Sequence, residues 1–344
     1  MNIVPGLLVA AVVWVTIDID KPDFSLLHHF DVLGLLLMAI FLGCLQYALQ
    51  EGPRWDWLDD PTIRTAMTVS ILGGSLFLWR ALSYRQPIVD LRVYRNRNFS
   101  FGSFFTFVTG VGMYGTTHLV PLFLAQVRGY NPVQIGLTII VTGLVTMVMS
   151  PLSTSIARRL DLRLMLALGF GLFAFSMYLT ATLTNQTGFW ELFVPQVVRG
   201  IGLMFFYMSA NMIALGTLPQ DKMKNAAGLY NLMRDLGGAI GLASIGTLMN
   251  ARLHFHWNRL IEDINLARPA VQRFLDTQTN RFDLLIPGNP NQAAVKLLAN
   301  LVHREALVLA YNDLLLLIGS LFVIGLMLIP MVRRPRSAFT ADRH

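Results

Sequence analysis

The chain has 344 residues, of which 54% are hydrophobic and only 14% are charged, and its mean hydropathy is +0.53. Such a composition would aggregate in water, which excludes a soluble globular protein and leaves an integral membrane protein. The formal net charge of +7 does not call for a nucleic-acid partner, because the basic residues gather in loops on one side of the predicted membrane spans.

Apolar stretches long enough to cross a hydrocarbon core of about 30 Å recur along the chain. The first is short and begins at the N-terminal methionine. It lacks the basic residues that open a signal peptide, and Asp18 and Asp20 follow it where a cleavage site needs small residues, so we interpret it as a shortened span. The single cysteine, Cys44, lies in the second stretch, and no disulfide framework is expected. Nine spans are predicted, at residues 3–17, 31–49, 62–82, 99–123, 133–157, 163–183, 190–217, 226–250 and 306–331.

Lys and Arg residues are distributed unevenly between the gaps that separate these spans. When the gaps are numbered alternately, one set holds fifteen basic residues, whereas the short gaps of the other set hold only Arg54 and Arg128. Cytoplasmic loops carry the excess of Lys and Arg, so we expect the N-terminus of this chain outside and its C-terminus in the cytoplasm. The fifteen residues are Lys21, Arg80, Arg85, Arg92, Arg95, Arg97, Arg158, Arg159, Arg163, Lys222, Lys224, Arg333, Arg334, Arg336 and Arg343.

The longest polar segment, residues 251–305, separates the last two spans. Three prolines interrupt it, and we expect one long external loop that carries one or two short amphipathic helices. His254 and His256 lie in this segment, but no third ligand is near them in the sequence, so no metal site is expected.

Charged side chains within the spans are the first candidates for a functional site, because a charge at the bilayer centre costs at least about 2.5–3.5 kcal/mol. Arg234 and Asp235 lie about nine residues, or about 13 Å, into their span. Neighbouring positions on a helix point about 100° apart, so we expect one side chain to face a cavity and the other a neighbouring helix. Asp313 lies about two turns inside the last span. Burial favours the neutral form of a carboxyl group, which makes Asp235 and Asp313 candidate proton sites; a structural network of satisfied charges is the alternative.

Five short segments are informative when they are taken together. They are NIVPG at residues 2–6, RQPIVDLRVYRNRNFSFG at 85–102, PLFLAQVRGYNPVQIGL at 121–137, GLYNLMRDLGGAIG at 228–241 and EALVLAYNDLLLLIG at 305–319. In order and spacing they resemble the major facilitator superfamily, specifically its fourteen-helix drug:proton antiporter branch of the EmrB/QacA type. They are similar to that branch's sixth helix, the link before its ninth helix, its ninth-to-tenth hairpin, and its thirteenth and fourteenth helices.

The resemblance implies an all-α polytopic membrane protein with a partial major facilitator superfamily fold of about nine transmembrane helices. These would correspond to helices six to fourteen, and the first five helices would be absent from this chain. We expect residues 1–30 to hold the last helix of the N-terminal half and a cytoplasmic loop, 31–98 two linker helices and a cytoplasmic link, 99–331 the C-terminal six-helix half, and 332–344 a basic cytoplasmic tail.

The resemblance also singles out polar positions. Asp161 and Arg163 match the end of the superfamily's gating motif, although Thr154 and Arg158 replace its Gly and Asp. Arg199 is similar to the Arg of an "RGxGxG" pattern associated with proton transfer, which usually lies in the other half; an Arg that caps carbonyls where helices cross is the alternative. The candidates for proton coupling or gating are Asp235, Arg234, Asp313, Arg199, Asp161 and Arg163.

In the implied fold, the spans 99–123 and 190–217 border a central cavity. Aromatic and Met side chains suit the binding of varied apolar compounds, because they offer large and adaptable contacts; the same residue types are also common on helices that face lipid. The candidates for the substrate cavity are Phe105, Met113, Tyr114, His118, Met204, Met208, Asn211 and Asn231.

The function that the resemblance implies is secondary active transport: proton-coupled efflux of amphipathic small molecules across the cell (inner) membrane. No enzyme activity and no cofactor are expected, since the sequence holds no Walker loop, nucleotide-binding glycine fingerprint or nucleophile elbow. Family members in cells with two membranes often work with a periplasmic adaptor and an outer-membrane channel. The alternative is a transport-incompetent fragment that acts at most as a scaffold or partner of another chain. A lipid-modifying membrane enzyme is a more distant alternative.

Overall fold

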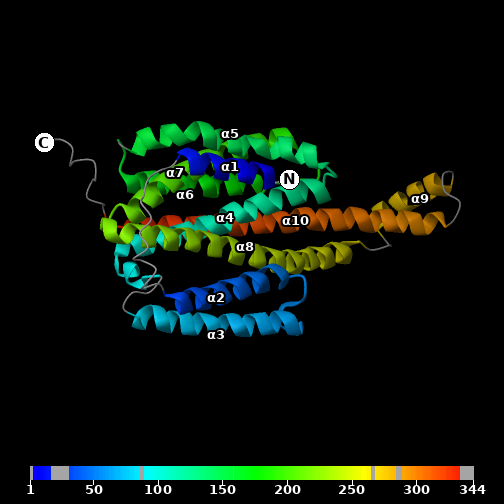
Figure 1. Ribbon diagram of the computed structural model, residues 1–344. Coiled ribbons are helices and arrows are strands. Elements are labelled where there is room, and N and C mark those ends of the chain that lie inside the picture. The colour runs from blue at the N-terminus through cyan, green and yellow to red at the C-terminus, as the bar shows by residue number, and fades with distance from the viewer. Residues whose placement is uncertain are drawn as a thin grey trace.

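The computed structural model describes residues 3–16, 31–84, 89–157, 159–264, 268–283 and 289–333, and within these ranges it contains helices and no strand (Figure 1). This confirms the all-α fold. The α-helices are α1 (Ile3–Thr16), α2 (Val32–Glu51), α3 (Pro61–Ser83), α4 (Arg97–Gln126), α5 (Pro132–Ala157), α6 (Leu162–Thr180), α7 (Phe189–Leu215), α8 (Gln220–Asp263), α9 (Pro269–Asp283) and α10 (Pro290–Leu328), and the 3₁₀ helices are η2 (Trp57–Asp59), η3 (Leu91–Arg95) and η4 (Ile329–Met331).

Seven of the helices in the described ranges are long and apolar enough to cross a membrane, against nine predicted spans: α2 to α7 and α10. The other two predicted spans fall on α1 and α8. Helix α1 has 14 residues, fewer than the roughly 20 that a bilayer requires. Helix α8 has 44 residues, but Arg234 and Asp235 interrupt its apolar stretch.

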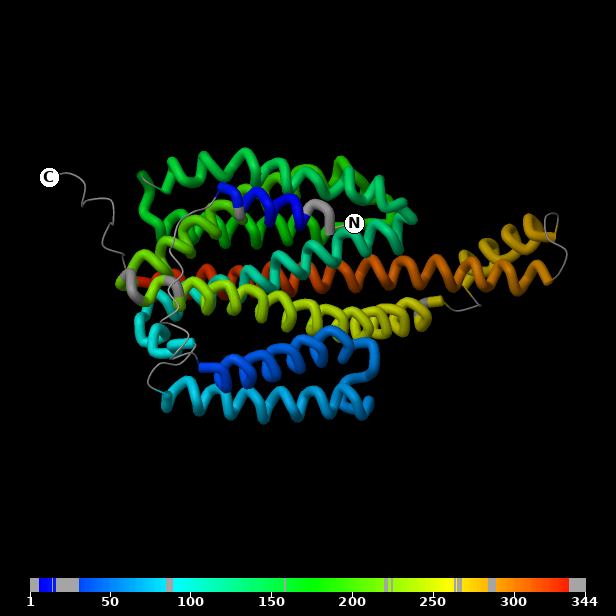
Figure 2. Tube along the Cα trace, in the orientation of Figure 1, coloured from blue at the N-terminus to red at the C-terminus, as the bar shows by residue number. Residues whose placement is uncertain are grey.

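The segment 251–305 is mostly helical, which corrects the expectation of one long loop. Helix α8 continues to Asp263, because residues 251–262 contain no Gly or Pro that would end it. Helices α9 and α10 then begin at Pro269 and Pro290, where the fixed φ of proline suits a first helical turn. Helix α9 and the beginning of α10, from Pro290, project beyond the other helices at one end of the bundle and are hereafter the arm (Figures 1 and 2). The short amphipathic helix that was expected in this segment is α9.

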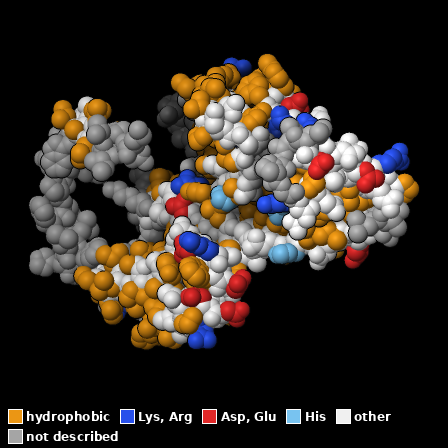
Figure 3. Space-filling view, turned by 90° about the vertical axis from the view of Figure 1, so that its right-hand side faces the viewer, with side chains coloured by type: hydrophobic (Ala, Val, Ile, Leu, Met, Phe, Trp, Pro, Cys, Tyr) orange, Lys and Arg blue, Asp and Glu red, His pale blue; other side chains and the backbone are white. Residues whose placement is uncertain are grey.

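The helices pack around an aromatic core at the centre of the bundle. Helix α4 packs mainly on α8, α6 on α7 and α10, and α5 on α7. The core includes Phe170, whose ring lies 5.3 Å from those of Phe105 and Phe206, and Phe173, which stacks on Phe322 at 4.0 Å. Seen from the arm end, apolar side chains cover much of the outside of the molecule (Figure 3). Met147, for example, is 76% exposed, as expected for a surface that faces lipid.

Helices α2 and α3 form a separate antiparallel pair that lies against α8 (Figure 1). One end of the pair is closed by an ion pair of 2.7 Å between Arg80 Nε and Asp31 Oδ1. At the other end, the indole Nε1 of Trp57 donates a hydrogen bond of 2.9 Å to Thr247 Oγ1 on α8. The end of the bundle opposite the arm, hereafter the basic end, carries Arg80, Arg92, Arg95, Arg97, Arg159, Arg163 and Arg333.

Candidate functional site

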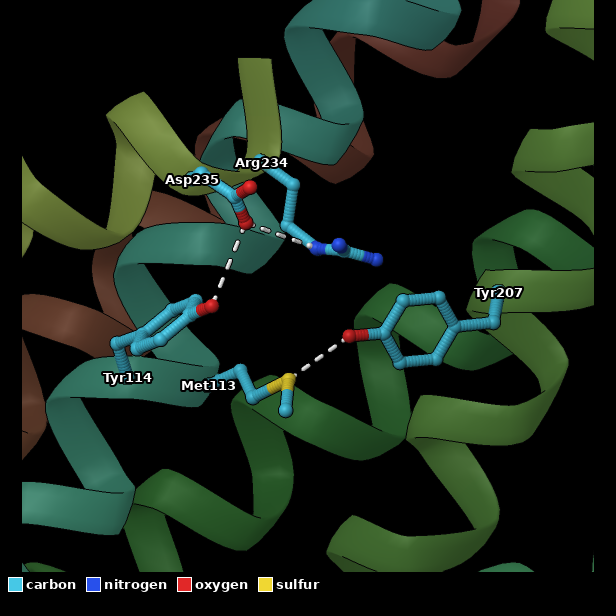
Figure 4. Close-up of polar contacts among 5 residues, drawn as sticks. All are labelled: Met113, Tyr114, Tyr207, Arg234 and Asp235. Carbon is cyan, nitrogen blue, oxygen red and sulfur yellow. Dashed lines mark hydrogen bonds and ion pairs between the residues drawn. The ribbon is translucent and has the colours of Figure 1, made fainter. Parts of the chain in front are cut away.

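Side chains from α4, α7 and α8 converge on one space within the bundle (Figure 4). The hydroxyl of Tyr114 donates a hydrogen bond of 3.3 Å to Asp235 Oδ1. The same carboxylate oxygen lies 3.4 Å from Nε of Arg234. Across the space, the hydroxyl of Tyr207 donates to the sulfur of Met113 at 2.8 Å. These five residues are hereafter the polar cluster.

A close crossing of α4 and α8 positions the cluster. At Gly110 a Cβ atom would meet the backbone oxygen of Arg234, and at Gly237 it would meet the backbone oxygen of Phe107. Only glycine lets the two backbones approach this closely. At Gly238 a Cβ atom would fall on the ring of Tyr114, so this third glycine leaves room for that ring beside Asp235.

Arg234 and Asp235 reach into the same space, which corrects the expectation that they face in different directions. The long side chain of Arg234 bends back along α8 to its neighbour, so its chain length overrides the 100° between their Cα–Cβ directions. The pair remains accessible, because the side chain of Asp235 is 56% exposed and that of Arg234 is 31% exposed.

The remaining candidates for the substrate cavity differ in how exposed their side chains are. Met204 and Met208 are half-buried on α7, and Asn211 and Asn231 are exposed. Phe105 is fully buried in the aromatic core and does not face an open space.

His118 lies away from the polar cluster, in a separate cavity between α4, α8 and α10. This cavity has a volume of about 550 Å³, and Met249, Asn250 and His303 also line it.

The side chain of Arg199 extends from α7 to α5. The guanidinium is buried, and its Nη2 donates a hydrogen bond of 2.8 Å to Thr142 Oγ1. One turn away, Gln196 donates to the backbone oxygen of Thr138 at 2.8 Å. These contacts join α7 to α5, so the structure places Arg199 at a helix–helix contact and does not bring it into the polar cluster.

Asp161 caps the first turn of α6. Its carboxylate accepts a hydrogen bond of 2.9 Å from the backbone N–H of Arg163, and a carboxylate is favoured there by the helix dipole. The two gating candidates therefore contact each other at the basic end and do not belong to the polar cluster.

Asp313 lies on α10, where side chains of α8 contact it. It accepts a hydrogen bond from, or donates one to, Nε2 of His256 at 2.8 Å, and Arg252 Nη1 lies 3.7 Å away. Its neighbour Asn312 donates to the backbone oxygen of Leu183, in the connection between α6 and α7. Helix α10 begins at Pro290, well before the predicted start of the last span at residue 306.

Sequence reasoning did not single out Tyr207, and it considered His256 only as a metal ligand. Tyr207 follows Met204 by three residues and precedes Asn211 by four, so helical periodicity places it on the face already singled out. No comparable signal pairs His256 with Asp313, because they lie on different helices and 57 residues apart.

Comparisons with known proteins agree with this architecture. Residues 3–242 match the Major Facilitator Superfamily. The chain is 35% identical over 324 residues to the colistin resistance protein EmrB of Acinetobacter baumannii, covering 94% of this chain and 63% of that protein. It is 28% identical over 338 residues to the multidrug export protein EmrB of Haemophilus influenzae, covering 97% and 64%, and 26% identical over 312 residues to the multidrug export protein EmrB of Escherichia coli, covering 90% and 60%. The chain thus spans a little under two thirds of the length of these relatives. By sequence, the chain belongs to the major facilitator superfamily.

Proposed function

We propose that this chain forms the C-terminal part of a secondary active exporter that expels amphipathic small molecules in exchange for protons. The polar cluster is the observation that carries the proposal. It presents an accessible carboxylate, a cation and a phenol beside half-buried Met side chains, in a family whose relatives include proteins named for multidrug export and colistin resistance.

Proton coupling would act through Asp235. When the carboxyl group is ionised, it holds Arg234 by charge and accepts the Tyr114 hydroxyl. When it gains a proton, the attraction to Arg234 is lost and the guanidinium is free to turn towards other partners. Such a change alters the charge that a substrate meets in the cavity. Alternating access in carriers of this kind links a change at the midplane to rocking of one half of the protein against the other.

The substrate would lie against Met113, Tyr207, Met204 and Met208. Thioether and aromatic groups adapt to apolar ligands of different shape, and Asn211 and Asn231 on neighbouring faces offer polar contacts. Cationic amphiphiles suit this site best when Asp235 is ionised, because the carboxylate is more exposed than the guanidinium beside it.

The same proposal includes the placement of the chain in the cell. The basic end would face the cytoplasm of a cell (inner) membrane, following the positive-inside rule, and the arm would lie outside. Residues 31–98 would serve as linker helices and 99–331 as the C-terminal half. In a cell with two membranes, a periplasmic adaptor and an outer-membrane channel are the proposed partners.

Efflux of a fluorescent cationic dye tests the proposal in a strain deprived of its own multidrug exporters. The chain is expressed alone and together with the part of the A. baumannii relative that the alignment leaves uncovered. We expect efflux from the second combination, its loss when a protonophore is added, and its strong reduction by Asp235→Asn. The control is Asp276→Asn, which changes an exposed carboxylate on α9 and should leave efflux intact.

A transport-incompetent scaffold or partner of another chain is the second candidate. It predicts that neither combination exports dye although both chains reach the membrane. Efflux that survives both the protonophore and Asp235→Asn would instead overturn the proton-coupled mechanism.

A further inference from the structure

A cavity of about 600 Å³ opens at the basic end, between the end of α3 and the 3₁₀ helix η3. It is lined by Leu82 of α3 and by Leu91, Arg92, Tyr94 and Arg95 of η3. Its position relates it to the membrane surface. The apolar helix α3 ends at Ser83, and the apolar helix α4 begins at Arg97. The cavity therefore lies at the level where hydrocarbon gives way to lipid headgroups.

The register of η3 brings two arginines to one side of this cavity. A 3₁₀ helix has three residues per turn, so side chains at i and i+3 are eclipsed. Arg92 and Arg95 are three residues apart, and so are Leu91 and Tyr94. One side of the short helix thus presents two guanidinium groups in line, and the adjoining side presents an aliphatic and an aromatic group.

The scaffold beneath these side chains is fixed. Asp90 caps η3 by accepting a hydrogen bond of 3.0 Å from the backbone N–H of Arg92. Val93 is 3% exposed and packs in a cluster with Phe99 and Tyr230. These contacts anchor η3 on the start of α4 and on the side of α8, so the two arginines extend from a well-packed base.

The opposite wall of the cavity is the end of α3, which is also held in place by side-chain contacts. The ion pair between Arg80 and Asp31 secures the end of α3, and the Arg80 guanidinium also lies over the ring of Tyr84. The guanidinium of Arg80 therefore already has Asp31 and Tyr84 as partners. Leu82, two residues further on, is 61% exposed and forms an apolar path from the cavity to the hydrocarbon region.

The two arginines of η3 differ from Arg80 in their partners. Both are exposed, and within the described ranges neither forms an ion pair with a carboxylate. Guanidinium groups bind phosphate oxygens in bidentate fashion, and basic sites next to membrane helices attract anionic headgroups. Two aligned cations also disfavour a cationic occupant.

We propose that this cavity binds the phosphate headgroup of an anionic phospholipid, with Arg92 and Arg95 on the phosphate and an acyl chain along Leu82. The lipid would come from the leaflet at the basic end. It would fasten the linker pair α2–α3 to the start of α4, since the cavity is built from both sides of that connection. The proposal does not depend on transport, so failure of the efflux experiment leaves it standing.

Native mass spectrometry of the purified chain tests the site. The chain in detergent is titrated with phosphatidylglycerol and, separately, with phosphatidylcholine, and the bound lipid is counted. An arginine near a membrane surface contributes about 1 kcal/mol of attraction to anionic lipid, or roughly fivefold in affinity. We therefore expect R92Q/R95Q to lose most of the preference for phosphatidylglycerol, by about 25-fold if the two residues act independently, while phosphatidylcholine binding is unchanged.

Two further variants keep the result interpretable. R92K/R95K retains the charges and should keep a large part of the preference, which separates loss of the site from misfolding of the glutamine variant. Arg64→Gln removes an exposed arginine from the other end of α3 and should change nothing. An equal loss in Arg64→Gln would show a general charge effect and overturn the proposal. Displacement of the lipid by an equal concentration of inorganic phosphate would also overturn it, because the site would then recognise phosphate without the lipid.

Discussion

Nε2 of His256 and Oδ2 of Asp313 lie 2.8 Å apart and join α8 to α10 beside the arm. Arg252, one turn before His256, adds a second basic group at 3.7 Å. The contact ties two helices that are separated in sequence by the whole of α9.

Replacing Asp313 should therefore loosen this junction. The group is only partly buried, so we expect Asp313→Ala to lower the free energy of unfolding by about 1 kcal/mol, and Asp313→Asn, which still accepts a hydrogen bond, to lower it less. Thermal unfolding in detergent measures both. His254→Ala, an exposed position on the same helix, should be neutral; an equal loss there would mean that the His256–Asp313 contact does not hold the helices.

The α4–α8 crossing should be intolerant of a single methyl group. At Gly237 a Cβ atom would collide with the backbone oxygen of Phe107, so Gly237→Ala must push the helices apart, at a cost of about 1–3 kcal/mol. Gly228 lies on the same helix and has nothing within 4 Å of its Cβ position. Gly228→Ala should be neutral or stabilising, by up to about 1 kcal/mol, because alanine favours a helix. Unfolding temperatures that fall equally in both variants would contradict the close crossing.

The indole of Trp57 should hold the linker pair to α8. Trp57→Phe keeps an aromatic ring but removes the donor to Thr247, which typically costs about 1 kcal/mol. We expect faster proteolysis between α2 and α3 in this variant. Trp79 is 68% exposed on α3, and Trp79→Phe should leave the cleavage rate unchanged; similar rates in the two variants would show that the indole hydrogen bond does not restrain the pair.

The N-terminus of α3 should lose stability in acid through Asp60. The backbone N–H of Ile63 and, more weakly, that of Thr62 donate to its carboxylate and hold the pKa of Asp60 below its ordinary value of 3.8. A lowered folded-state pKa means that the stabilisation is present above the ordinary value and is lost as the pH falls through the lowered one. Unfolding measured from about pH 6 down to about pH 3 should show this decline. Asp60→Asn keeps an acceptor at the cap and should remove that part of the pH dependence, whereas Asp59→Asn should preserve it.

The positions of the helices within the membrane were predictable from the hydropathy of the sequence, but their ends outside it were not. Apolar runs located α2 to α7, and five ordered segments indicated the superfamily that residues 3–242 match. Hydropathy does not mark where a helix ends outside the membrane, so α8 and α10 were predicted too short by many residues. Their extensions follow from helix propensity and from the prolines at 269 and 290.

The candidate site was predictable only in part. Residue type and depth singled out Asp235, Arg234, Met113 and Tyr114, and the structure brings these four together. Which residues meet across helices depends on helix packing, and a single sequence does not contain that information. For this reason Asp313 acquires a partner that the sequence did not suggest.

Because α10 is one continuous helix, a tilt of its inner part would displace the arm at its outer end. From Asp313 to Pro290 the helix runs about 35 Å without a break, and a continuous helix transmits a tilt along its whole length. A tilt of only about 10° about the level of Asp313 would therefore move the far end by about 6 Å. A fluorescent label pair on α9 and on the α6–α7 connection would report movements within the bundle, amplified at a point outside it.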